Sequence, residues 1–444
     1  MLELRDYQDQ ISTQAAQLLE QYKICYMAME CRTGKTLTAL AAALKYGAKS
    51  VLVISKLKAL PSIYNDYNLM RPTFTMDAIN YESAQKCLGN HYDLVILDEA
   101  HSLGSFPKPS QRTKTVKMLC KGLPIIYLSG TPTPESFSQL YHQFWVSSFS
   151  PFNLFTNFYK WAKVYVEPGL KKVGGHILND YSNARKDKID AVAKKLFIDY
   201  SQEEAGFDAK IVEYTLTVPM SKWTEGALTR LKKNKILSWD DVNILGDTPA
   251  KLMSKMHQLS SGSVIDENGT HIITDYSKAK YIRDYFAGKK IAIFYVYKTE
   301  LDLLKKAFPL WTDVPEIFQQ HKGNDMVYLG QVRSAREGVR LDTADALIFY
   351  NLEYSYLSYE QGKNRLSSKE RTAPAQVYFI CSDCGIEQDI LEAVHGKQDY
   401  TYSYYKSKQR DRIPSLNPQS ESRRKFLKPF IEKEASSIIY YKSK

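Results

Sequence analysis

The pattern of apolar and polar residues in the first third of the chain alternates between two periods. Residues 8–22 place their apolar side chains on one face of a helix, and residues 35–46 are rich in strong helix formers. Short continuous apolar runs separate these helical stretches, and such runs are typical of buried strands. The predicted strands span residues 24–29, 51–54, 77–81, 94–97 and 124–128.

The same alternation resumes in the second half of the chain. Residues 152–207 between the two halves contain aromatic and basic segments and a predicted helix at 187–196. Near-continuous apolar strands that alternate with helices are typical of a parallel sheet covered on both faces. The further strands are expected at 211–218, 291–295, 326–329, 346–350 and 376–380, and the further helices at 250–259, 277–285 and 300–307.

These patterns predict an α/β protein with two tandem lobes, each built on a parallel sheet with helices on both faces. We expect a first lobe at 1–207, which includes a helical lead-out at 152–207, and a second lobe at 208–398. A basic, tyrosine-rich tail is expected at 399–444. The length of 444 residues agrees with two domains, because a single core rarely grows beyond about 300 residues.

The net positive charge of the chain indicates a negatively charged partner. The formal net charge is +11, and residues 401–444 contain 11 Lys or Arg against 4 Asp or Glu, a surplus of seven. A polyanion is the partner that such a surplus favours, with nucleic acid first. The tail could stack bases on its tyrosines, could pack onto the second lobe, or could only solubilise the protein.

Membrane insertion and secretion are not expected. No apolar run approaches the roughly 20 residues that a membrane-spanning helix needs. The first residues carry an early acid and lack the apolar core of a signal peptide. We therefore expect a soluble, intracellular protein without a membrane partner.

The six cysteines are too sparse for a disulfide framework. Cys381 and Cys384 have the spacing of zinc ligands. A structural zinc needs about four ligands, and neither a second such pair nor a nearby histidine pair follows. A turn after a buried strand is the favoured interpretation, with a zinc site as the alternative.

The strongest local signal is the sequence Thr33-Gly34-Lys35-Thr36 between a predicted strand and a predicted helix. At such a junction the N–H groups of the helix N-terminus bind phosphates, the lysine reaches the β- and γ-phosphates, and the following hydroxyl binds Mg²⁺. The first glycine of the usual pattern is replaced by Met29. We therefore predict ATP and Mg²⁺ binding at this loop.

Two further segments follow predicted strands. Asp98 and Glu99 come after the strand at 94–97, 63 positions beyond the lysine of the phosphate loop. Ligands of open α/β sheets bind at the carboxyl ends of strands, so Asp98 is expected to hold Mg²⁺ and Glu99 to orient or deprotonate the attacking water. The alternative is a solvent-facing acidic helix cap. The segment Ser129-Gly130-Thr131-Pro132 would by itself suggest only a turn, but in series with the other two it becomes informative.

In this order the segments resemble the motifs of superfamily 2 helicases, and within them the Swi/Snf-type translocases, especially their compact phage relatives. The resemblance covers about residues 2–390. It implies two RecA-like lobes with an ATP cleft between them. The matching segments are 4–8 (LRDYQ), 28–36 (AMECRTGKT), 51–56, 80–83 (NYES), 98–101 (DEAH), 129–132 (SGTP), 291–295, 334–341 (SAREGVRL) and 361–365 (QGKNR).

The resemblance implies roles for particular residues. It assigns catalysis to Lys35, Asp98, Glu99 and Arg365, the last of which would reach the γ-phosphate. It places Mg²⁺ on Thr36 and Asp98. The nucleotide-binding set is Arg5, Gln8 (which would read adenine), Arg32, Thr33, Gly34, Lys35, Thr36, Gly338 and Arg365. Coupling of hydrolysis to movement falls to His101, Ser129 and Thr131, and nucleic-acid contacts to Ser55, Lys56, Asn80, Ser83 and Ser334.

The chain departs from the family pattern at three places. Arg32 replaces a glycine of the phosphate loop, and Ala335 and Arg336 replace the paired glycines of the motif at 334–341. The family motif has a second arginine three positions after Arg365, and in this chain that position is Ser368. Lys369 and Arg371 lie nearby in the sequence and could substitute for it.

The function implied is that of an ATP hydrolase, a DNA helicase or translocase that remodels duplex, forked or branched DNA without base-specific recognition. By the same resemblance, replication, recombination or repair in the cytoplasm of a bacterial or phage-infected cell is the expected setting, with replication or recombination proteins as further partners. Two alternatives remain. A degenerate ATPase clamp would bind forked DNA or a protein without turnover, and an RNA helicase would use the same motifs on RNA.

Overall fold

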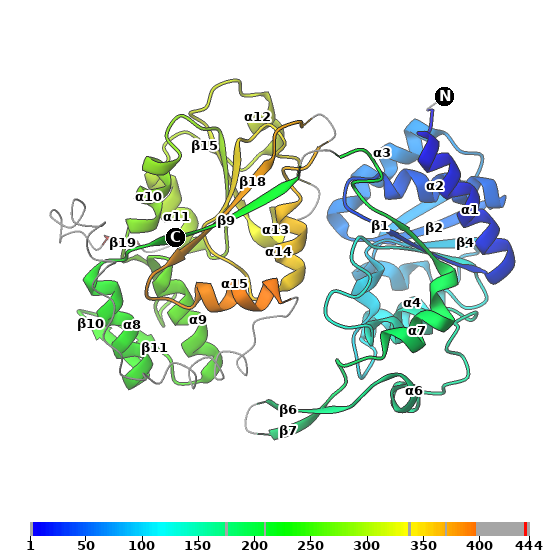
Figure 1. The fold of residues 1–444 in the computed structure, drawn as a ribbon, viewed down its shortest axis with the longest axis horizontal. Coiled ribbons are helices and arrows are strands. Elements are labelled where there is room, and N and C mark those ends of the chain that lie inside the picture. The colour runs from blue at the N-terminus through cyan, green and yellow to red at the C-terminus, as the bar shows by residue number, and fades with distance from the viewer. Residues whose placement is uncertain are drawn as a thin grey trace. The chain divides into compact units, whose positions relative to one another are not determined.

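The computed structural model describes residues 3–173, 176–207, 210–335, 339–368, 371–396 and 439–441, and the chain divides into two compact units. Unit 1 comprises Met1–Lys210 and Ser367–Pro374, and unit 2 comprises Ile211–Leu366 and Ala375–Lys444. Each unit contains one large parallel sheet (Figure 1). The units are described separately below.

The sheet of unit 1 has six parallel strands in the order β3-β2-β4-β5-β1-β8. Four of these strands are completely buried apolar runs or nearly so, which is what a sheet covered on both faces requires. In chain order the strands are β1 (Ile24–Met29), β2 (Ser50–Ser55), β3 (Thr75–Asn80), β4 (Leu94–Leu97), β5 (Ile125–Leu128) and β8 (Phe197–Tyr200).

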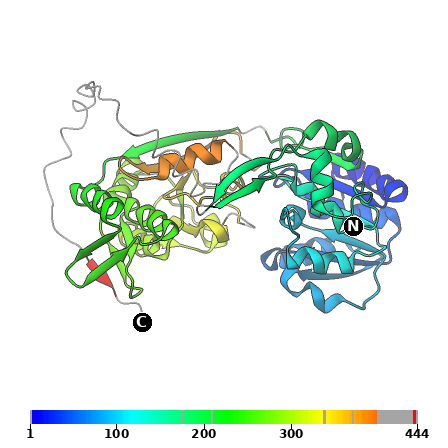
Figure 2. The same ribbon diagram turned by 90° about the horizontal axis from the view of Figure 1, so that it is seen from below.

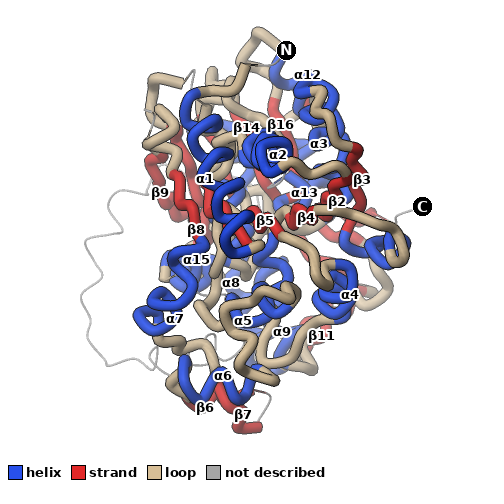
Figure 3. The backbone as a smooth tube through the Cα atoms, turned by 90° about the vertical axis from the view of Figure 1, so that its right-hand side faces the viewer, coloured by secondary structure: helices blue, strands red, loops and turns tan. Residues whose placement is uncertain are grey.

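Helices cover both faces of this sheet (Figure 3). One core forms where α1 (Asp6–Tyr22), α2 (Lys35–Tyr46) and α3 (Leu60–Met70) pack on the strands, with Leu19, Leu40 and Ile63 buried. The opposite core contains α4 (Gln111–Leu119), α5 (Gln139–Trp145), α6 (Phe158–Tyr165) and α7 (Lys186–Ala193). Short 3₁₀ turns complete this unit: η1 (Leu57–Ala59), η2 (Tyr81–Cys87), η3 (Ala100–Leu103) and η4 (Lys194–Leu196).

The segment 152–207 differs from the expected helical lead-out. It contains α6 and α7, but also an antiparallel hairpin of β6 (Gly169–Val173) and β7 (His176–Asp180), which extends away from the sheet of its unit (Figures 1 and 2). It ends in β8, which pairs with β1 as the edge strand of the sheet. This four-residue strand is too short to produce a recognisable period, and only its pairing with β1 defines it.

The sheet of unit 2 also has six parallel strands, in the order β15-β16-β14-β17-β18-β9. Its strand β9 begins the unit and pairs along its whole length with β18, which comes near the end. The strands are β9 (Ile211–Val218), β14 (Ile291–Tyr295), β15 (Trp311–Thr312), β16 (Val327–Gln331), β17 (Ala346–Phe349) and β18 (Ala375–Ser382).

Helices lie on both faces of the second sheet as well. On one face α10 (Ser277–Tyr285) and α11 (Lys298–Ala307) bury Ile282 and Leu303. The other face carries α8 (Lys222–Asn234), α9 (Pro249–Ser260), α12 (Pro315–Gln320), α13 (Val332–Ala335), α14 (Tyr356–Lys363) and α15 (Glu387–His395). Two small antiparallel sheets add β10 (Ile236–Trp239) with β11 (Val242–Leu245), and β12 (Ser263–Ile265) with β13 (His271–Ile273) and β19 (Ile439–Tyr441).

The chain is therefore an α/β protein with two parallel six-stranded sheets flanked by helices, as the alternation of periods predicts. Apart from β19, which pairs with β13, the basic tail expected at 399–444 lies outside the described residues, as do Gly338, Arg336 and Lys369. Among the helices that the structure describes, none is both long and apolar enough to cross a membrane.

Candidate functional site

The candidate residues of unit 1 gather at the carboxyl edge of its sheet. The phosphate loop follows β1, the acidic pair follows β4, and the segment Ser129-Gly130-Thr131-Pro132 follows β5. Since β5 lies between β1 and β4 and all three are parallel, their carboxyl ends are neighbours. Three segments spread over a hundred positions of sequence thus meet at one place.

The candidate phosphate loop, residues 30–34, contains two residues in the left-handed region of backbone conformation. Arg32 and Gly34 both have positive φ, at 65° and 79°, and Gly34 directly precedes α2. A Cβ atom at Gly34 would lie 2.4 Å from Nε2 of Gln8, so a side chain there would displace the glutamine. Glycine is therefore favoured by the positive φ, and any larger residue would also have to move the amide end of Gln8. Arg32 adopts the left-handed region despite its side chain, which is a strained conformation for such a residue.

Side chains from distant parts of unit 1 hold this loop. The hydroxyl of Thr33 donates to the carbonyl of Glu30 at 2.8 Å, and the hydroxyl of Tyr7 donates to the carbonyl of Thr33 at 3.1 Å. Gln202, which follows β8, donates from Nε2 to the carbonyl of Cys31 and from its backbone N–H to Oε2 of Glu30, both at 2.8 Å. Sequence patterns did not identify Tyr7 or Gln202, and nothing local to Gln202 marks it, because its partners lie 171 and 172 positions away.

The two residues before the loop that are predicted to contact nucleotide, Arg5 and Gln8, lie near it. Gln8 is buried, at 4% exposure, and its Oε1 accepts a hydrogen bond from the backbone N–H of Arg5 at 3.1 Å. The guanidinium of Arg5 donates to the hydroxyl of Tyr7. The amide of Gln8 therefore has a fixed orientation against Gly34, where it could read a polar edge of a bound base.

Arg32, the departure from the family glycine, has a specific partner. Its guanidinium donates to the carbonyl oxygen of Ser367, in the short segment Ser367–Pro374 that belongs to unit 1. The arginine thus ties the phosphate loop to a distant stretch of chain, which a glycine could not do.

Lys35 opens α2 and lies close to all three segments. Its Nζ donates to the carbonyl of Glu30 at 3.2 Å, and a Cβ atom at Gly130 would lie 3.6 Å from the same nitrogen. Its positive charge also acts on Asp98, where it favours the ionised carboxylate. Thr36, the second residue of α2, lies in the same first turn, whose N–H groups have no acceptor within the helix.

Asp98 is held at the junction between β4 and the next loop. Its Oδ2 accepts a hydrogen bond from the hydroxyl of Ser55 at 2.6 Å, and its backbone carbonyl accepts one from the hydroxyl of Tyr81, also at 2.6 Å. Burial and the neighbouring charge of Glu99 raise the pKa of Asp98 to about 6, although Ser55 and Lys35 act in the opposite direction. A carboxyl with a raised pKa beside a lysine, at a strand end, is a typical feature of functional sites.

Glu99 and the segment after β5 are linked through His101. Glu99 has a φ of 51°, the left-handed region, and it precedes η3, which contains His101. Nδ1 of His101 lies 3.2 Å from Oε2 of Glu99 and 2.9 Å from Oγ of Ser129. The same Oγ accepts a hydrogen bond from the backbone N–H of Thr131 at 3.1 Å. The three residues expected to couple hydrolysis to movement are therefore brought together by contact.

The candidate nucleic-acid contacts of unit 1 differ in accessibility. Ser55 is fully buried and engaged with Asp98, whereas Lys56, Asn80 and Ser83 are partly exposed. Nδ2 of Asn80 donates to Oε2 of Glu82 at 3.1 Å. The positions after β2 and β3 thus include surface groups that a phosphate could reach.

The candidates in unit 2 are reported for that unit alone. Arg365 is buried, at 8% exposure, and its Nε donates to the carbonyl of Gln361 at 3.0 Å. Ser334 is exposed on α13. The backbone N–H of Arg371, in the segment grouped with unit 1, donates to the carbonyl of Ser368 at 3.3 Å. Neither the role of Arg365 nor a substitute for the second family arginine follows from these contacts.

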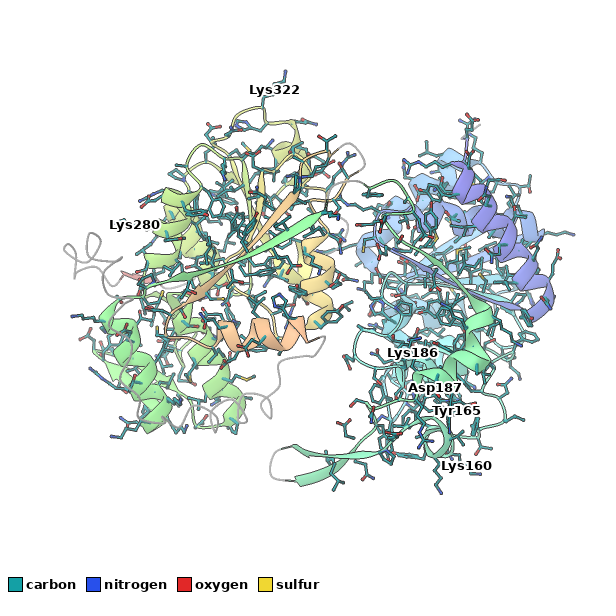
Figure 4. All side chains as sticks on the ribbon, in the orientation of Figure 1. Lys160, Tyr165, Lys186, Asp187, Lys280 and Lys322 are labelled. Carbon is teal, nitrogen blue, oxygen red and sulfur yellow. The ribbon has the colours of Figure 1, made fainter. Side chains whose placement is uncertain are left out.

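A cavity of about 370 Å³ lies beside the phosphate loop, on the face of the sheet that α5 and α7 cover. Glu30, Gly130 and Pro132 form its side toward the loop, and Lys186, at the start of α7 (Figure 4), lines it from the helix. Lys186 pairs with Asp190, and Lys194 pairs with Asp199, so the charges of these cavity residues are balanced.

The described residues contain no group of three or more His, Cys, Asp or Glu side chains that could hold a metal ion by themselves. Cys381 is buried in β18, and Cys384 follows the strand; both are free thiols. Burial raises the pKa of each to about 12. The Mg²⁺ expected with ATP would take most of its ligands from phosphate and water, with Thr36 and Asp98 as the protein's share.

No model of a known protein family matches the chain, and no curated protein resembles it significantly.

Proposed function

We propose that this chain is a nucleic-acid-stimulated ATPase, a DNA translocase or helicase whose two units are RecA-like lobes. One observation carries the proposal. The phosphate loop, the acidic pair and the segment after β5 meet at one sheet edge, with the charge of Lys35 acting on Asp98 and with His101 between Glu99 and Ser129. Phosphoryl transfer needs this set of groups at one place, because it depends on positioning and on charge stabilisation.

The residues fit a nucleoside triphosphate and Mg²⁺. Gly34 has a positive φ, and Gln8 lies close to it. Because Gly34 has no side chain, the backbone at the N-terminus of α2 is open to a phosphate, which is where phosphates bind. When bound, Mg²⁺ neutralises charge on the phosphate oxygens. In this proposal Thr36 and Asp98 hold the ion, Lys35 binds the phosphates, and Glu99 accepts a proton from, or orients, the attacking water.

The nucleic-acid part of the proposal rests on charge and on the motif order. The net charge of +11 favours a polyanion, and contacts to phosphates by Lys and Arg give affinity without reading sequence. The resemblance to Swi/Snf-type translocases favours DNA over RNA. A role in replication, recombination or repair follows from that resemblance only.

The test is the ATPase rate of the wild type and three variants, measured without nucleic acid and with single-stranded, duplex or forked DNA, or RNA. Lys35→Ala is expected to lower the stimulated rate by at least about 100-fold, because it removes a cation from the developing charge. Glu99→Gln is expected to stop turnover while ATP still binds. Lys45→Ala is the matched control. Lys45 lies in the last turn of the same helix α2, where it pairs with Asp9.

Each outcome has a distinct meaning. Stimulation by DNA that Lys35→Ala loses and Lys45→Ala keeps supports the proposal, and stimulation by RNA alone replaces the DNA motor with an RNA helicase. Binding of ATP without turnover in every condition overturns the motor and favours a nucleic-acid clamp. Turnover in Glu99→Gln contradicts the role of that carboxylate alone.

A further inference from the structure

Tyr81 joins the surface after β3 to the peptide between the two acidic residues. It is the first residue of η2, between Asn80 and Ser83, which are candidate nucleic-acid contacts. We propose that Tyr81 is a positioning residue that transmits polynucleotide binding at residues 80–83 to Asp98 and Glu99. This inference rests on the proposed function, and it adds a regulatory link that the motif order does not contain.

The inner end of this link is the Asp98–Glu99 peptide. The hydroxyl of Tyr81 donates to the carbonyl oxygen of Asp98 at 2.6 Å, and the N–H of Asp98 donates to the carbonyl of Ile54 at 2.9 Å. The first bond holds the Asp98–Glu99 peptide itself, and the second holds the preceding Leu97–Asp98 peptide, so both peptides before Glu99, whose φ is 51°, are fixed. A left-handed glutamate is maintained only when its surroundings hold it, so the direction of its carboxylate depends on Tyr81.

The outer end of the link is exposed and charged. The guanidinium of Arg112, on α4, lies 5.2 Å from the centre of the Tyr81 ring and pairs with Oε1 of Glu82 at 2.5 Å. The side chains of Arg112 and Glu82 are 36% and 60% exposed. A nucleic-acid phosphate at residues 80–83 would compete with Glu82 for Arg112, because arginine binds both anions in the same geometry. That exchange of partner would occur directly on the ring of Tyr81.

Tyr81 itself is suited to carry a displacement. Its side chain is buried, at 3% exposure, in the same core as Leu97, Ala100 and Leu103, which flank the acidic pair. A close-packed side chain cannot move without moving its neighbours.

The experiment compares Tyr81→Phe with a matched control, Tyr67→Phe. Tyr67, on α3, also donates its hydroxyl to a backbone carbonyl, that of Phe74 at 2.7 Å, but far along the chain from the acidic pair. Tyr81→Phe is expected to lower the DNA-stimulated kcat by about 10-fold, the worth of one well-placed hydrogen bond. The KM for ATP and the half-stimulating DNA concentration should stay within about twofold of wild type. Tyr67→Phe should change none of these three constants.

A second variant tests the outer end without disturbing the core. Glu82→Gln removes the exposed competitor of Arg112, so the half-stimulating DNA concentration should fall by about threefold, within the range of one exposed ion pair. If the half-stimulating DNA concentration of Glu82→Gln is unchanged, the Arg112–Glu82 pair is not the place where DNA binding acts on Tyr81.

The remaining outcomes separate this inference from the proposed function. A wild type that DNA stimulates, together with a Tyr81→Phe variant that keeps its full stimulated kcat, overturns the inference alone. An equal loss of basal and stimulated rates in Tyr81→Phe, with a lowered melting temperature, shows a purely structural tyrosine and also overturns it. A wild type without any stimulated turnover overturns the proposed function, and the inference with it.

Discussion

The carboxyl edges of the two parallel sheets both carry a lysine and acidic residues, but the two sets differ in their exposure to solvent. At the edge of the first sheet, Lys35 and Asp98 are partly exposed, and Glu99 is held by a strained backbone. At the edge of the second sheet, Lys278 and Glu387 form an ion pair at 2.6 Å with side chains 0% and 1% exposed. The same kind of sheet edge thus carries accessible charges in one unit and enclosed charges in the other.

The charged groups at the second edge have hydrogen-bond partners of their own. Oε2 of Glu387 accepts a hydrogen bond from Ser382 at 2.7 Å, and Nζ of Lys278 also donates to the carbonyl of Tyr350 at 3.3 Å. Glu300, which is likewise buried, accepts hydrogen bonds from the backbone N–H groups of Val296 and Tyr297 at 2.8 and 3.0 Å. A buried network of this kind tightens the fold because each charge has its partners.

The pKa directions of the two acids express the same difference. Burial and Glu99 raise the pKa of Asp98. Burial would also raise the pKa of Glu387, but Lys278, His257 and Ser382 together outweigh it, and the pKa lies below its ordinary value. At the first edge the ionised form of Asp98 is therefore disfavoured, and a bound cation could stabilise it. At the second edge the ionised form of Glu387 is favoured, and its ion pair stabilises the fold.

The largest effect is expected from breaking the second edge. Glu387→Gln leaves Lys278 buried without its counter-charge, and the free energy of unfolding should fall by about 3 to 5 kcal/mol. Denaturant unfolding at pH 7 measures it. Glu392→Gln, an exposed glutamate on the same helix α15, should change stability by less than about 0.5 kcal/mol.

A double variant sharpens this test. Replacing both Lys278 and Glu387 with methionine should restore most of the lost stability, because no uncompensated charge remains. Equal losses in Glu387→Gln and Glu392→Gln would show that the pair is not a stabilising element, and the comparison between the edges would fail.

A smaller effect of opposite sign is expected at the first edge. Because the folded pKa of Asp98 is raised from 3.8 to about 6, the native state binds this proton more tightly than the unfolded state. Asp98 therefore lowers stability as the pH rises from about 4 to 6, and the full penalty remains above that range. Asp98→Asn should raise the free energy of unfolding at pH 8 by about 1 to 3 kcal/mol and leave it almost unchanged at pH 4.

The control for this prediction is Asp187→Asn, an exposed aspartate in the first turn of α7, which should change stability by less than about 0.5 kcal/mol at either pH. A less stable Asp98→Asn protein at pH 8 would mean that Asp98 contributes to folding as Glu387 does. The two edges would then not differ in the way described.

The smallest effect concerns the pH dependence of hydrolysis. In its proposed role Asp98 would have to be ionised to hold Mg²⁺, so kcat/KM for ATP should fall as the pH drops through about 6. The hydrogen bond from Ser55 lowers the pKa of Asp98, so Ser55→Ala should move this fall upward by about 0.5 to 1 pH unit. Ser12→Ala, which removes another buried hydroxyl, should leave the profile in place. A profile that is identical in Ser55→Ala would refute the assignment of the acidic limb to Asp98.

The sequence by itself determined the class of fold and the meeting of its motifs. The predicted strands at 24–29 and 94–97 coincide with β1 and β4, because continuous apolar runs between polar segments are a local signal. The placement of Lys35 near Asp98 also follows from the sequence, since parallel strands end at a common edge. The role of these residues in hydrolysis remains a prediction.

Only the tertiary structure decided which distant residues complete each edge. Tyr81 is one of 32 tyrosines, and its bond to Asp98 arises because β3 and β4, which precede the two residues, both pair with β2 in parallel. Gln202 reaches the phosphate loop through the pairing of β8 with β1, and Lys278 meets Glu387 across 109 positions of chain. Periods and propensities describe a residue's neighbours in sequence, whereas these partners are selected by the packing of whole elements.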